Sequence, residues 1–208
     1  MKIGFMGCHR TGKTTTALAL AEKLDIPYIK TSATDTLRRL GVPADKTMSF
    51  SDRLWVQGEI LKDAIKVWSS EDRFVTDRTP LCMIGYVMAD ITSEPLSSIE
   101  EDVLFGYIDL CKAATEHFTD IFMLRPGIPY IEDDSKEVGF SSRAYIAKLD
   151  AIMRSLVLSD SGLKCDNAIV FDKDCTDLDK RVQICFDQAV WCQNSRDADE
   201  SSTAFVSH

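Results

Sequence analysis

The chain has 208 residues, of which 45% are hydrophobic, and a formal net charge of −9. This size suits one compact domain with a full core and excludes a second large domain. The acidic balance opposes non-specific binding to nucleic acid. No run of about 18 apolar residues occurs and no cleavable apolar segment stands at the start, so we expect a cytoplasmic protein without a membrane partner.

The N-terminal segment combines a strand, a glycine loop and a helix. Residues 2–6 form a short apolar run typical of a buried parallel strand, and residues 14–24 place alanine and leucine on one helical face. The stretch between them, GCHRTGKT from Gly7 to Thr14, fits the phosphate-binding pattern G-x-x-x-x-G-K-[ST]. The pattern stands where such a loop must stand, between strand and helix. We therefore expect the chain to bind a nucleoside triphosphate, ATP.

The residue types of this loop match the chemistry of phosphate binding. Successive backbone N–H groups and the positive end of a helix neutralise phosphate oxygens. Lys13 is expected to reach the β- and γ-phosphates, and the Thr14 hydroxyl to be a ligand of Mg²⁺. Cys8 and His9 are interpreted as loop fillers, and Arg10 as an alternative phosphate ligand. The residues predicted to bind the nucleotide are Gly7, Cys8, His9, Arg10, Thr11, Gly12, Lys13, Thr14 and Thr15.

The middle of the chain continues the alternation of strands and helices. A strand predicted at residues 26–30 ends at the capping residues Thr31 and Ser32, before a helix at 33–40 that Gly41 closes. Ser49 or Ser51 is expected to cap the next helix. The remaining elements predicted in this part are a helix at 50–68, a strand at 73–77, helices at 81–91 and 99–114, and a strand at 120–124.

The C-terminal third begins with a polar stretch rich in proline and glycine. It is long for a plain connection, so residues 126–142 are a candidate mobile lid, with an ordinary surface loop as the alternative. A helix at 143–157, a strand at 167–171 and a helix at 178–191 follow. Residues 194–208 lack periodicity and are expected to be a disordered acidic tail, which leaves residues 1–193 as the folded domain.

The order of these elements predicts an α/β fold. Strands that alternate with helices indicate a parallel sheet of about five strands covered by helices on both faces, a three-layer α/β/α arrangement. In such a sheet, ligands bind at the carboxyl edge of the strands. Seven scattered cysteines without C-x-x-C pairing fit free thiols better than disulfides or zinc ligands.

A second group of functional candidates ends the strand predicted at residues 73–77. Asp77 and Arg78 follow the apolar residues FVT and should therefore face the same edge of the sheet as Lys13. There Asp77 could act through the Mg²⁺ shell or accept a proton from an attacking hydroxyl. Arg78 could hold an anionic substrate group. The alternative is a helix-capping Asp77 followed by a surface Arg78.

Together, GCHRTGKTT, FVTDRTPL and the lid-like LRPGIPYIEDD before SSRAY resemble the small P-loop kinases. The resemblance covers residues 1 to about 160 and is nearest to the NMP-kinase-like group often classed with AAA-family ATPases, which includes bacteriophage nucleotide kinases and ribosylnicotinamide-kinase-like proteins. It implies a P-loop NTPase fold with a lid that closes over ATP. It also implies catalytic roles for Lys13, Asp77 and Arg78, magnesium bound by Thr14 and Asp77, and lid contacts from Lys136 and Arg143. Arg38, from a basic cluster with Lys30, Arg39 and Lys46, is a further candidate for substrate contact.

Two departures limit this resemblance. The lid stretch is poor in arginine and rich in acid, with Glu132, Asp133, Asp134 and Glu137, whereas a nucleotide kinase typically has an arginine-rich lid. The chain also lacks the apolar strand ending in Asp-Glu that motor ATPases use to activate water. The second departure favours phosphoryl transfer over a motor.

The expected function is phosphoryl transfer from ATP, dependent on Mg²⁺, to a nucleoside monophosphate or nucleoside. One alternative is a kinase for hydroxymethylpyrimidine bases in phage DNA; a basic patch at Arg38, Arg39 and Lys46 would favour it, and the net charge opposes it. The other alternative is a nucleotide-dependent switch or regulatory ATPase. The sequence leaves the acceptor and the oligomeric state open.

Overall fold

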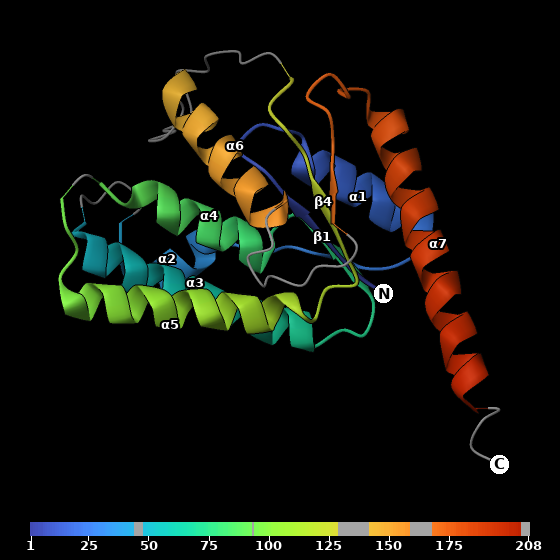
Figure 1. The fold of residues 1–208 in the computed structure, drawn as a ribbon, viewed down its shortest axis with the longest axis horizontal. Coiled ribbons are helices and arrows are strands. Elements are labelled where there is room, and N and C mark those ends of the chain that lie inside the picture. Colours follow the sequence, from blue (N-terminus) through green and yellow to red (C-terminus); the bar gives the residue numbers. More distant parts are fainter. Residues whose placement is uncertain (44–47, 93, 129–141, 159–167, 205–208) are drawn as a thin grey trace.

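The structure is a computed structural model that describes residues 1–43, 48–92, 94–128, 142–158 and 168–204. It contains one parallel sheet with the strand order β2-β3-β1-β4-β5. Figure 1 shows the neighbouring strands β1 and β4 of this sheet. The strands are β1 (Lys2–Met6), β2 (Tyr28–Ile29), β3 (Phe74–Thr76), β4 (Asp120–Met123) and β5 (Ala168–Val170). The helices are α1 (Lys13–Leu24), α2 (Ala33–Leu40), α3 (Phe50–Ser69), α4 (Pro80–Asp90), α5 (Ser98–Thr115), α6 (Arg143–Leu158) and α7 (Leu178–Ala204).

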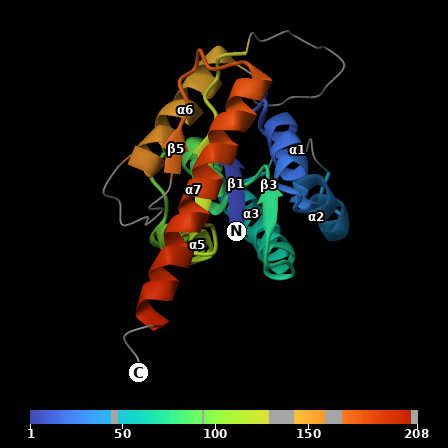
Figure 2. The same cartoon turned by 90° about the vertical axis from the view of Figure 1, so that its right-hand side faces the viewer.

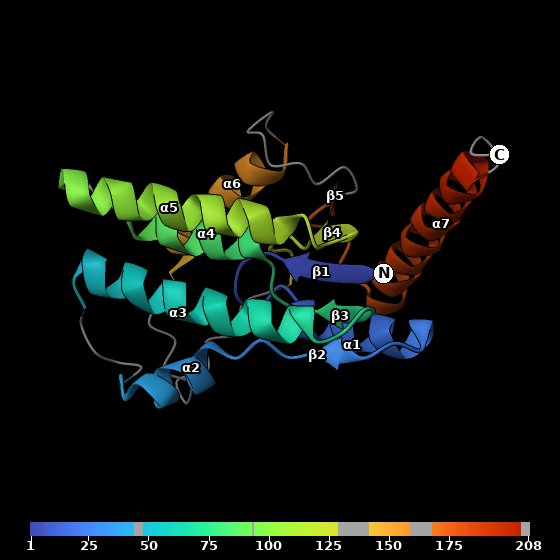
Figure 3. The same ribbon diagram turned by 90° about the horizontal axis from the view of Figure 1, so that it is seen from below.

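Helices cover both faces of the sheet, which confirms the predicted three-layer α/β/α class. Because side chains alternate along a strand, Ile3 and Phe5 of β1 face the core that α1 and α7 cover. Met6 faces the opposite core, which α3, α4, α5 and α6 complete. Figure 3 shows α3, α4 and α5 lying together beside the strands, and Figure 2 shows α7 running along the other face.

The strand order brings the carboxyl ends of three strands together. β1 pairs with β3 on one side and with β4 on the other, and β2 extends the sheet beyond β3. The loops after β1, β2 and β3 therefore lie next to one another at one edge. This is the edge where parallel α/β sheets bind ligands.

Side-chain caps define where several helices begin. Ser49, not Ser51, accepts a hydrogen bond from the Asp52 N–H and starts α3. Ser32 caps α2 in the same way, as predicted. Thr79 caps α4, whose first residue is Pro80, so the chain turns sharply from the end of β3 into a buried helix.

The end of the chain corrects one prediction. The helix expected over 178–191 continues to Ala204, so residues 194–204 are helical and not disordered. Two side-chain hydrogen bonds at four-residue spacing stabilise this extension. The Gln193 amide donates to Asp197 at 2.7 Å, and the Ser195 hydroxyl donates to the Trp191 carbonyl at 3.0 Å. Arg196 also lies 3.7 Å from the buried carboxylate of Asp120. Residues 205–208 lie outside the described part.

The second strand is shorter than predicted. Only Tyr28 and Ile29 of the expected run 26–30 are paired, both with β3. The six cysteines of the described part are free thiols, as expected, and Cys175 alone among them is not buried. Across the described ranges, no helix is both long and apolar enough to cross a membrane.

Candidate active site

The loop between β1 and α1 has the backbone shape that the glycine pattern predicts. Gly7 and Gly12 have φ angles of +137° and +87°, values that favour glycine. A Cβ at Gly7 would lie 2.2 Å from the carbonyl oxygen of Leu124, so the loop packs directly against the end of β4. Gly12 is the N-cap of α1. The first N–H groups of α1 therefore lie at the carboxyl edge of the sheet, and such groups at a helix N-terminus stabilise an anion.

Lys13 lies at the start of α1 with its amino group held inside the loop. Its Nζ donates to the carbonyl oxygen of Cys8 at 2.5 Å, and the Thr11 hydroxyl donates to the same oxygen at 3.1 Å. Burial lowers the pKa of Lys13 from its usual value. The loop thus holds a desolvated cation where the sequence pattern places the phosphates.

Cys8 is fully buried within the loop, and its thiol lies 3.5 Å from the carbonyl oxygen of Ile146 on α6. Burial raises the pKa of Cys8 to about 12. The thiol is therefore protonated at neutral pH. This geometry supports the interpretation of Cys8 as a small neutral filler of the loop.

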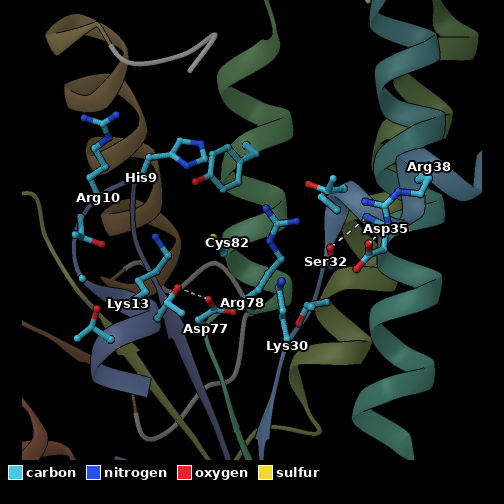
Figure 4. A pocket seen from close by; sticks show the side chains of 18 residues that line it. His9, Arg10, Lys13, Lys30, Ser32, Asp35, Arg38, Asp77, Arg78 and Cys82 are labelled. Carbon is cyan, nitrogen blue, oxygen red and sulfur yellow. Dashed lines mark hydrogen bonds and ion pairs between the residues drawn. The ribbon is translucent and has the colours of Figure 1, made fainter. Parts of the chain in front are cut away.

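Asp77, at the end of β3, meets the first turn of α1. Its carboxylate accepts a hydrogen bond from the Thr14 hydroxyl (Figure 4). Tyr28 on β2 also hydrogen-bonds to Asp77, and its pKa is raised, first by burial and then by this carboxylate. Thr14 and Asp77, the two predicted magnesium ligands, therefore lie together. Tyr28 of β2 lies beside Asp77.

The oxygen atoms of Thr14 and Asp77 fit a magnesium site. Both are hard donors, and Mg²⁺ is usually bound through one or two carboxylates together with substrate phosphates and water. Over the described ranges, no group of three or more histidine, cysteine or carboxylate side chains could hold a metal. A metal at Thr14 and Asp77 would therefore take further ligands from the nucleotide.

A cavity of about 940 Å³ opens beside the loop. Its walls come from the phosphate loop, from the end of β2 with α2, and from the end of β3 with α4. This volume lies within the range of small-molecule sites, roughly 300–1,000 Å³. The lining carries five cationic residues, Arg10, Lys13, Lys30, Arg38 and Arg78, and two carboxylates, Asp35 and Asp77. An acidic protein therefore has a predominantly basic cavity.

The cations extend across the cavity from the loop toward α2. In Figure 4, Lys13 and Arg38 lie on opposite sides, and Arg78 and Lys30 lie between them. Arg38 forms an ion pair with Asp35 at 2.6 Å, and both side chains are well exposed. Such a pair contributes little to stability, so Arg38 can exchange Asp35 for an anionic ligand. Neither Lys30 nor Arg78 forms an ion pair within the described part of the chain. These two cations are available to an anionic ligand.

Two residues of the cavity wall, His9 and Arg78, contact the aromatic ring of Tyr86. The Arg78 guanidinium lies 5.9 Å from the ring centre of Tyr86, and the His9 ring lies 5.2 Å from the same ring. The pKa of His9 is lowered to about 4, first by burial and then by Lys13, Arg78 and Arg10. His9 is therefore neutral at pH 7 in the free protein, and the neighbouring cations contribute to this state after burial.

The remaining predicted site residues have different positions. Arg10 and Thr15 are exposed and line the cavity. Arg143 begins α6, is exposed and does not line the cavity. Lys136 and most of the expected lid, residues 129–141, lie outside the described residues. The lid stretch starts just after Arg125, whose side chain pairs with Asp150 of α6 at 3.1 Å.

Several residues of the site were not predicted as functional. Lys30 is expected only as the last residue of the strand predicted at 26–30 and as a member of the basic cluster; it ends that strand as Asp77 ends another, and this position is the signal that identifies it. The sequence predicts Tyr28 only as a residue of the same strand. Tyr86 and Cys82 also line the cavity, and their helix reads equally well as core.

The family of the chain follows from comparison with known proteins. A family model described as an AAA domain matches residues 2–156, which include the phosphate loop and Asp77. The chain belongs to this AAA-domain family. No curated protein matches this AAA-domain protein significantly.

Solved structures with the same fold include NadR and two kinases. NadR in complex with NR superposes with a TM-score of 0.66 and 18% identity over 90% of this chain, which spans 50% of the NadR chain. Deoxyadenosine kinase from M. mycoides has a TM-score of 0.64 and 15% identity, with 91% of this chain and 98% of that chain covered. Thymidylate kinase from Candida albicans has a TM-score of 0.61 and 16% identity, with 93% and 92% covered. At these identities, the likeness shows that the AAA-domain protein shares the fold of these three proteins.

Proposed function

We propose that the protein transfers the γ-phosphoryl group of ATP to a nucleotide-like acceptor. The observation that carries the proposal is that two groups of cationic residues, each suited to an anion, line one cavity. The phosphate loop with Lys13 forms the first, and Lys30, Arg38 and Arg78 form the second. A simple ATP-binding switch needs only the first. The fold shared with kinases of deoxyadenosine and thymidylate also supports a nucleoside or nucleotide acceptor.

The reaction needs little covalent chemistry from the protein. An acceptor oxygen forms a bond to the γ-phosphorus, and the bond from that phosphorus to the β–γ bridging oxygen breaks. The electron pair of the broken bond leaves with ADP. Lys13 and the loop N–H groups hold the phosphates, and positioning with charge neutralisation supplies most of the catalysis. Bound Mg²⁺, held by Thr14 and Asp77, would neutralise charge on the β- and γ-phosphates.

Within this proposal, a monophosphate acceptor fits the cavity better than a neutral nucleoside. Lys30 and Arg78 face the cavity without carboxylate partners in the described chain, and a phosphate group on the acceptor would neutralise them. A phosphate oxygen is largely deprotonated at neutral pH, because its second pKa is about 6. It therefore needs no general base. In this case Asp77 serves the metal and orients Thr14, whereas a hydroxyl acceptor would require Asp77 to accept its proton.

A DNA acceptor is the second candidate that the sequence raised. The basic patch that would favour it is partly neutralised in the structure, because Arg39 lies 2.8 Å from Asp63 and 3.3 Å from Glu59. Arg38 has the exposed, easily exchanged pair with Asp35 and faces the cavity. Lys46 lies outside the described residues. The pairing of Arg39 supports a small acceptor, and strong salt dependence of DNA binding would support the other candidate.

The test is transfer from γ-labelled ATP with Mg²⁺ to a panel of acceptors. The panel contains nucleosides, nucleoside monophosphates, nicotinamide riboside, and DNA with plain or hydroxymethylated pyrimidines. Label on one acceptor that is lost in Lys13→Ala identifies the substrate and the reaction. Steady phosphate release with no labelled acceptor would instead indicate a regulatory ATPase.

A further inference from the structure

Arg181 is a buried cation beneath the phosphate loop. It lies in the first turn of α7, is 2% exposed and is among the largest fully buried side chains. It forms no ion pair with any residue of the described ranges. Burying a guanidinium without a counter-charge is costly, and an apolar side chain would fill the same space without that cost. The position therefore calls for an explanation beyond core packing.

The hydrogen bonds of Arg181 join two loops of the site edge. Its Nη1 donates to the carbonyl oxygen of Thr11 in the phosphate loop at 2.7 Å, although the two residues are 170 positions apart. Its Nε donates to the carbonyl oxygen of Cys175, in the loop after β5, at 2.5 Å. Both acceptors are backbone atoms, so the contact fixes main chain and not merely side chains.

The contact with Thr11 sets the direction of the next peptide N–H group. A trans peptide is planar, and its C=O and N–H bonds point in opposite directions. Holding the Thr11 carbonyl toward Arg181 therefore directs the Gly12 N–H to the other side of the peptide. Arg181 also packs closely against Gly12, because a Cβ at Gly12 would lie 2.9 Å from Arg181 Nη1. Its N–H is among the loop donors expected to face phosphate.

Arg181 is itself held rigidly. The Asp177 carboxylate caps the start of α7 by accepting from the Lys180 N–H at 2.8 Å, and the Asp177 carbonyl accepts from the Arg181 N–H at 3.1 Å. The loop before it is closed by a hydrogen bond from the Cys175 N–H to the Asp172 carbonyl at 3.0 Å. Helix α7 also packs along α1. Arg181 thus projects from a fixed base onto a loop that must keep its shape.

One nitrogen of the guanidinium remains without a protein partner. Arg181 Nη2 is buried and finds no hydrogen-bond acceptor among the described residues. The positive charge is therefore not compensated locally, and it adds to the potential that the loop presents to an anion. Geometry and charge both favour a bound phosphate.

We infer that Arg181 is a positioning residue of the phosphate loop, whose two-carbonyl fork holds the Thr11–Gly12 peptide in the orientation that binds the phosphates of ATP. This inference rests on the proposed function, in that it takes the loop to bind ATP. Arg181 acts through the backbone, so its loss weakens ATP binding more than it affects the acceptor.

The test compares Arg181→Met with the matched control Lys180→Met. Lys180 is the exposed neighbour in the same helical turn, so its variant removes one cation without touching the loop. The dissociation constant of Mg·ATP is measured by calorimetry well below the melting temperature of each variant. We expect at least a tenfold weaker affinity in Arg181→Met, a matching rise in KM for ATP with an unchanged KM for the acceptor, and less than a twofold change in Lys180→Met. A merely structural role would lower the melting temperature and leave the affinity of the folded protein unchanged, and that result would overturn the inference.

Arg181→Lys covers the case in which the methionine variant does not fold. Lysine keeps the charge, but one ammonium cannot bond both the Thr11 and Cys175 carbonyls as the planar fork does. We expect the ATP affinity of Arg181→Lys to be at least threefold weaker than that of the wild type. Wild-type affinity would overturn the inference that the two hydrogen bonds of the guanidinium position the loop. The wild type separates this inference from the proposed function. If it binds ATP but phosphorylates no acceptor, the proposed function fails while the affinity comparison still decides the role of Arg181.

Discussion

Thr14 and Asp77 are 63 positions apart in the sequence, and the Thr14 hydroxyl donates a hydrogen bond to the Asp77 carboxylate. The contact exists because β1 and β3 are neighbours, so the loop after one strand meets the end of the other. It connects the phosphate loop to the wall of the cavity that also holds Arg78. A change at Asp77 should therefore affect the geometry of transfer more than the binding of ATP.

Replacing Asp77 by Asn keeps the shape of the side chain and removes its charge. We expect ATP affinity to change by less than about threefold, because Lys13 and the loop N–H groups remain. Transfer should fall by about 10²-fold or more, the usual loss when a catalytic charge or proton acceptor is removed. Calorimetry with Mg·ATP and a single-turnover transfer assay measure the two quantities. Transfer at the wild-type rate would remove Asp77 from the mechanism.

Replacing Lys13 by Met should separate activity from stability. Burial lowers the pKa of Lys13, so the folded state disfavours its charge. Removing the ammonium should therefore leave the melting temperature unchanged or raise it, while transfer falls by about 10²–10³-fold. Thermal unfolding without nucleotide and the transfer assay test the two parts. A variant with a lower melting temperature and wild-type transfer activity per folded molecule would contradict this assignment.

The sequence predicts the sheet edge better than the cavity around it. Asp77 could be placed near Thr14 because both follow apolar strands, and parallel strands end at a common edge. The same rule applies to Lys30 after β2, but a single lysine at the end of a strand is equally typical of an exposed surface residue. Tyr28 joins Asp77 through strand order, which a single sequence does not specify.

Two other features depend on contacts that no local pattern encodes. The hydrogen bond from Arg181 to Thr11 spans 170 positions, and its helix reads as an ordinary amphipathic segment. The last part of α7 looks like a polar tail by composition. Side-chain hydrogen bonds at four-residue spacing and the pairing of Arg196 with Asp120 keep it helical.

Replacing Arg78 by Met tests whether the acceptor carries an anion. Arg78 faces the cavity without an ion-pair partner in the described chain, so an acceptor phosphate gains a charge-assisted contact there. We expect KM for a nucleoside monophosphate to rise by about tenfold, equivalent to about 1.4 kcal/mol, with KM for ATP changed by less than about threefold. Lys112→Met on α5, outside the cavity, is the control. An equal effect on a neutral nucleoside acceptor would indicate a role other than phosphate recognition.

His9 provides a pH-dependent test of its environment, which combines burial with the charge of the neighbouring cations. Its pKa is about 4 in the free folded protein, against about 6.5 for an ordinary histidine. Between these values the folded state binds fewer protons at His9 than the unfolded state. The free energy of unfolding should therefore fall as the pH decreases from 6.5 toward 4, and the His9→Gln variant should lack this contribution.

Binding of ATP should offset the second cause of this shift, which is the positive charge of Lys13, Arg78 and Arg10. The neighbouring cations disfavour protonation of His9, and the phosphate charges of ATP offset those cations. The pKa of His9 should therefore rise when ATP binds, and by linkage ATP should bind more tightly to the protonated form. Because ATP itself titrates in this range, the informative quantity is the difference between wild type and His9→Gln. The His9 ring resonance followed by NMR and the affinity measured from pH 7 to pH 5 test the prediction; equal affinity profiles with an unshifted resonance would mean that the phosphates do not reach the cavity beside His9.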